Sequence, residues 1–341
     1  MKKIITLLII IPYLIISQQV TTETMLHNGL ERSYILYVPE SYSENNPTPL
    51  VLNLHGYSSN AGQQMIYSDF YTIAETEGFI LIHPEGTVDI FDFQFWNSGD
   101  LAEIDDVGFL SALIDTIVSE YTINTDRVYS MGMSNGGFMS YRIACELSDK
   151  IAAIASVTGS MSTNQISSCN PSNPVPVMQV HGTSDPTVLY NGSVGIEPID
   201  DVVSFWVNLN NCNTQPIFNY IADLNLIDLC TAEHYIYEEG DNDTSVELYK
   251  VINGGHTWPG AAIPLVGNNT NQDFSASEKI WEFFNKYDIN GLISNNSQIA
   301  HFETEKTIIK TIDILGRLCE RGGAHINIYN DGSVEKKYLL K

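Results

Sequence analysis

One short segment constrains the fold of this chain more than any other. Gly132-Met133-Ser134-Asn135-Gly136-Gly137 separates a predicted buried strand, 127–131, from a stretch with helical spacing, 138–147. Glycines permit a turn too tight for side chains, so the serine between them projects its hydroxyl above the edge of the sheet. This strand–turn–helix setting makes Ser134 the candidate nucleophile and disfavours the alternative, a chance Gly-x-Ser-x-Gly in a Gly-rich turn.

Two later segments supply residues that could activate a serine. Asp185 follows a predicted strand, 175–180, and His256 follows another, 246–252. A histidine accepts the hydroxyl proton, and a carboxylate fixes the tautomer and stabilises the charged form of that histidine. The chain order serine, aspartate, histidine predicts a catalytic triad of Ser134, Asp185 and His256. Taken singly, the aspartate would equally well cap a turn, and the histidine would equally well be packed.

Strands alternate with helices along most of the chain. Alternation of this kind predicts a mostly parallel sheet covered by helices on both faces, which with the serine turn indicates an α/β-hydrolase fold. An Asn28-Gly29 pair predicts a hairpin over 21–37 at the start. The other predicted strands are 50–54, 79–82 and 152–157, and the predicted helices include 104–121, 199–209 and 275–286.

An early strand ends at Leu54-His55-Gly56-Tyr57, where this fold places a second donor for an oxyanion. We therefore assign the backbone N–H groups of Tyr57 and Asn135 to the oxyanion hole. His55 itself is predicted to be structural rather than catalytic.

The first residues predict export. Lys2 and Lys3 precede a short apolar run, 4–16, and Ser17 offers a small residue for cleavage. The run is shorter than the roughly 20 residues that a spanning helix needs, so residues 1–17 are interpreted as a secretory signal peptide. We expect a secreted or cell-surface protein without stable membrane insertion.

Five cysteines agree with an oxidising compartment. Four lie in the catalytic region and allow three connectivities. The two sequence-local pairings, Cys145–Cys169 and Cys212–Cys230, are favoured, and Cys319 is then left over. None has the paired short spacing of a zinc site.

The charge is strongly negative, with 16 Lys and Arg against 41 Asp and Glu and a net charge of −25. Such a surface repels nucleic acid and anionic membranes, because affinity for phosphates rests on basic residues. No metal is expected, although calcium at an acidic loop, 100–106 or 238–243, stays open as an alternative.

Four segments together resemble the polyhydroxybutyrate depolymerase and feruloyl esterase family of secreted α/β-hydrolases. They are 54–57, 132–137, 181–186 and 254–260. The resemblance covers roughly residues 25–285 and is most specific over Gly254 to Gly260, with its Thr-Trp-Pro-Gly ending. It implies ester cleavage through an acyl-enzyme without a cofactor. It also implies that Trp96 and Trp258 form aromatic walls of the substrate pocket, with core packing as the alternative. The stretch 210–243 matches least and is a candidate cap over the site.

The last residues differ in character. Residues 303–341 carry seven basic and six acidic side chains, and they contain Asp313 to Arg317 and Ile326 to Lys337. These stretches are similar to the C-terminal sorting domain of type IX secretion substrates, which implies a small β-sandwich recognised by that machinery. A carbohydrate-binding or inert β-tail is the alternative. The expected organisation is therefore a signal peptide, 1–17, a catalytic domain, 18–287, a linker, 288–302, and a sorting domain, 303–341.

The function expected from these features is a secreted serine carboxylic ester hydrolase. Its expected partners are polymeric or oligomeric esters: feruloyl or acetyl esters of polysaccharides, or hydroxyalkanoate-type polyesters. A serine peptidase of the same fold is an alternative, although such enzymes usually carry an additional propeller or large cap. The other alternative is a non-catalytic binding or adhesin module on a hydrolase scaffold.

Overall fold

The computed structural model describes residues 19–99, 103–263 and 268–293, and three strands near the C-terminus. The chain divides into two compact units, Met1–Ile293 and Ser294–Lys341. The predicted signal peptide, 1–17, and Cys319 lie outside the described residues. No helix in the described ranges is long and apolar enough to cross a membrane.

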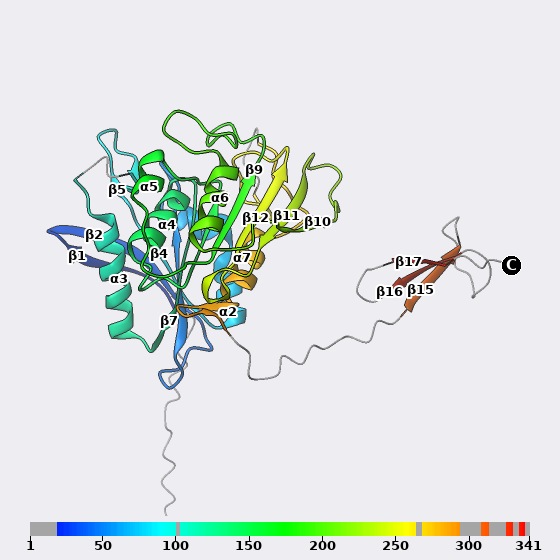
Figure 1. Ribbon diagram of the computed structural model, residues 1–341. Helices are drawn as coiled ribbons and strands as arrows, with labels where there is room; N and C mark the ends of the chain where they lie inside the picture. Colours follow the sequence, from blue (N-terminus) through cyan, green and yellow to red (C-terminus); the bar gives the residue numbers. More distant parts are fainter. Residues whose placement is uncertain are drawn as a thin grey trace, which may run out of the picture. The chain divides into compact units, whose positions relative to one another are not determined.

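A ten-stranded sheet forms the centre of the first unit (Figure 1). The strand order is β1-β2-β4-β3-β7-β8-β9-β12-β11-β10, and the strands from β4 to β12 in this order run parallel. Central parallel strands are covered on both faces, which explains why their sequences are apolar without alternation. The strands are β1 (Gln19–His27), β2 (Leu30–Val38), β3 (Thr48–Leu54), β4 (Ile80–Pro84), β7 (Ile123–Met133), β8 (Ala153–Val157), β9 (Val177–Gly182), β10 (Ile217–Ile221), β11 (Thr231–Tyr237) and β12 (Val246–Ile252).

Helices cover both faces of this sheet and form two separate cores. One core contains buried side chains of α3, α4 and α6, and the other contains those of α2 and α7. This arrangement confirms the predicted α/β architecture. The helices are α1 (Ala61–Ser68), α2 (Phe70–Glu77), α3 (Asp106–Glu120), α4 (Asn135–Glu146), α5 (Thr163–Ser168), α6 (Ile199–Leu209) and α7 (Ala276–Phe284).

The stretch 210–243 extends the sheet and does not form a separate helical cap. β10 and β11 pair antiparallel with each other, and β11 pairs antiparallel with β12. A three-residue helix, η1 (Asp241–Asp243), then leads into β12. The expected cap is therefore wrong. The β-branched and aromatic residues of this stretch form strands that continue the sheet beyond β12.

The aromatic-rich segment that follows β4 contains a small hairpin. Its strands are β5 (Thr87–Val88) and β6 (Gln94–Phe95), which pair antiparallel. The Tyr57 hydroxyl donates to the Asp89 carboxylate at 2.7 Å, and the Tyr57 ring lies 5.7 Å from that of Phe93. The hairpin is thereby attached to the end of β3.

The first unit extends beyond the predicted boundary at residue 287. β13 (Tyr287–Asp288) and β14 (Gly291–Leu292) form a hairpin, and the Ile289 N–H donates to the Asp126 carbonyl at 2.8 Å. Residues 288–293 therefore belong to the first unit and not to a linker. In the second unit, β15 (Ile308–Asp313), β16 (His325–Tyr329) and β17 (Val334–Lys337) form one antiparallel sheet.

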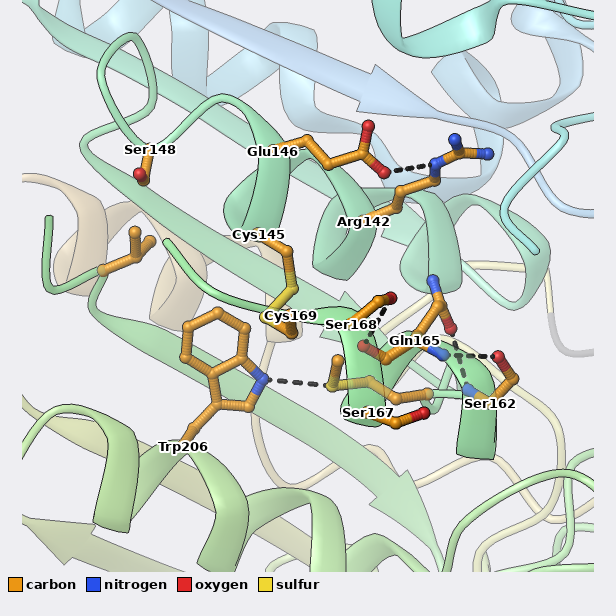
Figure 2. The surroundings of a disulfide bond; sticks show 12 residues. Arg142, Cys145, Glu146, Ser148, Ser162, Gln165, Ser167, Ser168, Cys169 and Trp206 are labelled. Carbon is orange, nitrogen blue, oxygen red and sulfur yellow. Dashed lines mark hydrogen bonds and ion pairs between the residues drawn. A yellow bond between two sulfur atoms is a disulfide. The ribbon is translucent and has the colours of Figure 1, made fainter. Parts of the chain in front are cut away.

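A disulfide joins Cys145, in the last turn of α4, to Cys169 at the end of α5 (Figure 2). Gln165 adds a second link between these helices, because its side chain donates to the Phe138 carbonyl at 3.1 Å. The predicted Cys145–Cys169 pair is thus present.

The predicted Cys212–Cys230 pair is wrong, because both thiols are free and buried. Cys230 precedes β11 at one end, whereas Asn213, next to Cys212, bonds to Glu238 beyond the other end. The seven residues of β11 separate these ends by roughly 20 Å at the rise of a β-strand, far beyond the reach of a disulfide. Burial raises the pKa of Cys212 to about 11 and that of Cys230 to about 12.

Candidate active site

Ser134 occupies a strained turn between β7 and α4. Its backbone has φ 52° and ψ −119°, which lies outside the backbone conformations that residues other than glycine ordinarily adopt. Its N–H donates to the Val157 carbonyl of the neighbouring strand at 2.8 Å, which holds the turn against the sheet. A Cβ at Gly132 would collide with the backbone of Gly136, and a Cβ at Gly136 would collide with the Leu54 carbonyl. The glycines of the motif are therefore required by close packing of α4 against β7 and β3.

Asp185 and His256 meet at the same edge of the sheet. Asp185 lies three residues after β9, and His256 lies four residues after β12. The Nδ1 atom of His256 lies 2.7 Å from Oδ2 of Asp185. The two loops are tied directly, since the Ser184 N–H donates to the Gly254 carbonyl at 2.9 Å. Parallel neighbouring strands thus bring together two residues that are 71 positions apart.

The Asp185 side chain is fully buried, and its other oxygen is also bonded. Oδ1 accepts the N–H groups of Thr187 at 2.8 Å and Val188 at 2.9 Å. An ionised carboxylate accepts and never donates, so Asp185 places the proton of His256 on Nδ1 and leaves Nε2 as the basic atom. This is the tautomer that a general base for Ser134 requires.

His181 supports the same carboxylate and was not identified from the sequence. Its Nε2 atom donates to the Val188 carbonyl at 2.8 Å and lies 3.4 Å from Oδ2 of Asp185. Burial lowers the pKa of His181, because the charged ring would lose its hydration. The His181 imidazole is therefore neutral, and it packs against the Asp185 carboxylate. No sequence signal distinguishes this role from that of any other buried histidine.

A cavity of about 870 Å³ opens beside Ser134 and His256. Backbone and side chains at the end of β3, including Tyr57, form one part of its wall. Much of the remaining lining is apolar or aromatic and comes from α1, α2 and the segment after His256: Ile66, Tyr67, Tyr71, Ile73, Trp258, Ala261 and Ile263. A cavity of this size and character suits a substrate with a sizeable apolar group next to its reacting bond.

The two predicted aromatic walls behave differently. Trp258 lines the cavity and is also packed, with 1% exposure and its indole N–H donating to Ser277 Oγ at 2.9 Å. Trp96 is 1% exposed and does not belong to the cavity lining; its ring lies in the core, 5.1 Å from the His55 ring. The expectation that Trp96 is a pocket wall is therefore corrected, because its indole is turned inward to a backbone acceptor.

The two assigned oxyanion donors come from separate segments, the loop after β3 and the start of α4. Tyr57 lines the cavity, and Asn135 is the first residue of α4, where helix N–H groups have no acceptor within the helix. His55 is fully buried, consistent with its predicted structural role. Its Nε2 accepts the Gly86 N–H at 2.9 Å, so Nδ1 carries the proton and donates to the Gly56 carbonyl at 2.8 Å.

A buried ion pair holds the loop that precedes α3. The Arg32 guanidinium donates to Oδ1 of Asp106 at 2.7 Å, and Oδ2 of Asp106 accepts the Asn97 N–H at 2.7 Å. Asp105 caps α3 by accepting the Gly108 N–H at 2.8 Å. Both aspartates thus support the loop. Neither their role nor that of Arg32 is assigned in the sequence analysis above.

The acidic loops show no assembled cation site in the part of the chain that the structure describes. No three His, Cys, Asp or Glu side chains come together there in the manner of metal ligands. Residues 100–102 of one candidate calcium loop lie outside the described ranges.

The sheet order, the serine turn and the paired aspartate and histidine at its carboxyl edge define an α/β-hydrolase. The chain belongs to the esterase PHB depolymerase family, whose model matches residues 32–208. The acetyl xylan esterase structure from Aspergillus awamori has the same fold, with a TM-score of 0.57 and 16% identity. The superposition covers 78% of this chain and 99% of that one.

Two curated relatives are considerably longer than this chain. The bifunctional acetylxylan esterase/xylanase of Neocallimastix patriciarum is 26% identical over 266 residues, which cover 78% of this chain and 35% of the relative. Feruloyl esterase B of Piromyces equi is 27% identical over 237 residues, which cover 66% of this chain and 42% of the relative. This chain therefore spans less than half of the length of either protein.

Proposed function

We propose that this protein is a serine carboxylesterase that cleaves feruloyl or acetyl esters of polysaccharides, or hydroxyalkanoate-type polyesters. The observation that carries the proposal is the 2.7 Å contact between His256 and the buried Asp185, with His256 and Ser134 lining one cavity. Family membership and the activities named for the two relatives support an ester as the substrate. We favour polysaccharide esters, because the two relatives are named as an acetylxylan esterase and a feruloyl esterase.

In the proposed reaction, Nε2 of His256 takes the proton of the Ser134 hydroxyl as Oγ attacks the ester carbonyl carbon. The negative charge that develops on the carbonyl oxygen is stabilised by the N–H groups of Tyr57 and Asn135. His256 then gives its proton to the leaving alcohol, and an acyl-enzyme remains on Ser134. Water, activated by His256, releases the acid and restores the serine. Asp185 keeps the imidazole oriented and stabilises its charged form, and no cofactor is needed.

This proposal is tested by measuring ester hydrolysis by the chain without its predicted signal peptide, residues 1–17. Methyl ferulate, acetylated xylan and a hydroxybutyrate oligomer would be compared, with Ser134→Ala as the control. We expect activity on at least one class that disappears in the variant, and labelling of Ser134 by an organophosphonate. A folded wild-type protein that neither hydrolyses esters nor labels would be a binding module instead. Hydrolysis of peptide amides in preference to esters would identify a peptidase.

The ends of the chain support a proposed route out of the cell. Residues 1–17 have the pattern of a signal peptide, and 303–341 resemble a sorting domain recognised by type IX secretion machinery. Deleting 303–341 should leave the enzyme in the periplasm of a type IX-competent host, whereas the full chain should reach the surface or medium. Equal surface delivery of both forms would contradict a sorting role.

A further inference from the structure

Trp96 points into the core and not into the cavity, so its role differs from that of the predicted pocket wall. The Trp96 indole N–H donates to the His55 carbonyl at 3.0 Å. The Trp96 backbone N–H donates to Oδ1 of Asn135 at 2.6 Å, and the Trp96 carbonyl accepts from Nδ2 of Asn135 at 3.0 Å. Each hydrogen-bonding group of this one residue therefore contacts one of the two segments that carry the assigned oxyanion donors.

In the segment after β3, Trp96 helps to fix the peptide that contains the Tyr57 N–H. Two successive carbonyls are held there: the His55 carbonyl by Trp96, and the Gly56 carbonyl by Nδ1 of His55 at 2.8 Å. Peptide units are planar, so holding both carbonyls sets the torsions at Gly56 and hence the direction of the Tyr57 N–H. The next N–H, of Ser58, donates to the Gln94 carbonyl at 2.8 Å, which attaches the same loop to β6.

In the second segment, Trp96 holds the start of α4 through Asn135. The Asn135 side-chain amide bonds to both the N–H and the carbonyl of Trp96, so its amide plane is fixed by two bonds of opposite sense. The same Nδ2 atom also reaches Ser98 Oγ at 3.3 Å. A side chain held in this way restrains its own Cα and therefore the adjoining N–H. α4 can approach this region closely because Gly136 has no Cβ, which would lie 2.7 Å from the His55 carbonyl.

We propose that Trp96 is a positioning residue that fixes the Tyr57 and Asn135 N–H groups relative to each other as one oxyanion hole. The inference rests on the proposed esterase function, in which both N–H groups bind the same oxygen. An oxyanion hole is effective only when its donors lie about 2.7–3.1 Å from the oxygen of the transition state, so small displacements of either peptide reduce the rate. Trp96 touches no reacting atom and acts through the two segments that it joins.

A matched pair of substitutions tests the role. Trp96→Phe removes the indole N–H and keeps an aromatic ring. Trp206→Phe makes the same change at another fully buried tryptophan, whose indole N–H donates to the Met161 sulfur at 3.2 Å (Figure 2). For Trp96→Phe we expect kcat on methyl ferulate or p-nitrophenyl acetate to fall by about tenfold to a hundredfold, part of the loss seen when an entire donor is removed. KM should stay within about twofold, because the donors act on the transition state.

Binding of a trifluoromethyl ketone separates positioning from a general loss of structure. Ser134 adds to the ketone carbon and the resulting oxyanion occupies the same hole, so the inhibition constant should rise by the factor lost in kcat. Affinity for the free acid product should not change. Trp206→Phe should leave kcat and the ketone inhibition constant within about twofold of the wild type. If Trp96→Phe does not fold, Asn135→Ala removes the opposite side of the same link and should show the same split between kcat and KM.

Three results would overturn the inference. Equal effects of Trp96→Phe and Trp206→Phe would show that only packing is involved. A loss confined to KM would assign Trp96 to substrate binding, and a loss of kcat with unchanged ketone affinity would remove the link to the oxyanion. These results all require an active wild-type enzyme. A wild-type protein without activity or phosphonate labelling would instead overturn the proposed function together with this role.

Discussion

The Nδ1 atom of His256 lies 2.7 Å from a carboxylate oxygen of Asp185, whose second oxygen accepts two backbone N–H groups. The loop conformation, and not the histidine alone, therefore decides which oxygen faces the imidazole. Substitution at Asp185 can change the chemistry presented to His256 while retaining the bonds that shape the loop.

Asp185→Asn should abolish most of the activity without unfolding the protein. An asparagine can keep its oxygen toward Thr187 and Val188 and then presents an NH₂ group to Nδ1 of His256. The imidazole must accept at Nδ1 and carry its proton on Nε2, so it cannot take the Ser134 proton. By analogy with other serine hydrolases, kcat should fall by about 10⁴-fold near neutral pH. Steady-state kinetics and circular dichroism would check this, and a loss below tenfold would show that Asp185 does not set the tautomer.

The residues proposed to perform the chemistry can be selected from the sequence because their signals are local. Ser134 lies in a Gly-rich turn between a strand and a helix, and Asp185 and His256 each follow an apolar run. The observed limits of α6, 199–209, and β12, 246–252, match the predicted ones, since both segments have strong periodic or apolar patterns.

The remaining features depend on contacts between distant segments. Whether Trp96 faces a cavity or the core is decided by acceptors at His55 and Asn135, 41 and 39 positions away. Cys212 and Cys230 are close in sequence, yet β11 separates the ends at which they lie. An aromatic in a loop or a pair of nearby cysteines has the same local pattern in either arrangement, so sequence reasoning alone selected the wrong one.

Arg32→Met should strongly destabilise the first unit. The Arg32 and Asp106 side chains are 3% and 0% exposed, and the guanidinium carbon also lies 3.9 Å from the centre of the Phe109 ring. Removing the arginine leaves a buried carboxylate without its counter-charge, which typically costs about 3–5 kcal/mol. Urea unfolding would measure the loss.

The exposed pair Lys150–Asp115 provides the control for this measurement. Its side chains are 29% and 66% exposed, so Lys150→Met should change the free energy of unfolding by less than about 1 kcal/mol. The double variant Arg32→Met/Asp106→Leu should recover part of the loss, because no unpaired charge remains. A cost at Arg32 no larger than that at Lys150 would mean that the buried pair contributes little.

Removing the disulfide should lower stability with little effect on the site. Cys145 and Cys169 are 24 positions apart. A cross-link that closes a loop of this length raises the free energy of the unfolded chain by about 3.5 kcal/mol. Cys145→Ala/Cys169→Ala should therefore unfold at lower urea concentration, while KM stays unchanged because the bond lies at the far end of α4 from Ser134. The control is Cys212→Ser, since that thiol is free. A stability of the double variant within 1 kcal/mol of the wild type would show that α4 and α5 are held without the bond.

Acid should destabilise the fold through His83, which is fully buried in β4. Burial lowers its pKa from 6.5 to about 3. Between these values the unfolded chain binds a proton at this position and the folded chain does not, so the free energy of unfolding decreases as the pH falls below 6.5. At pH 5 the expected contribution is about 2 kcal/mol. His181 contributes with the same sign, so urea unfolding at pH 7 and pH 5 should be compared between wild type and His83→Leu. The variant should lose about 2 kcal/mol less on acidification, whereas equal losses in the two proteins would mean that His83 becomes protonated without unfolding.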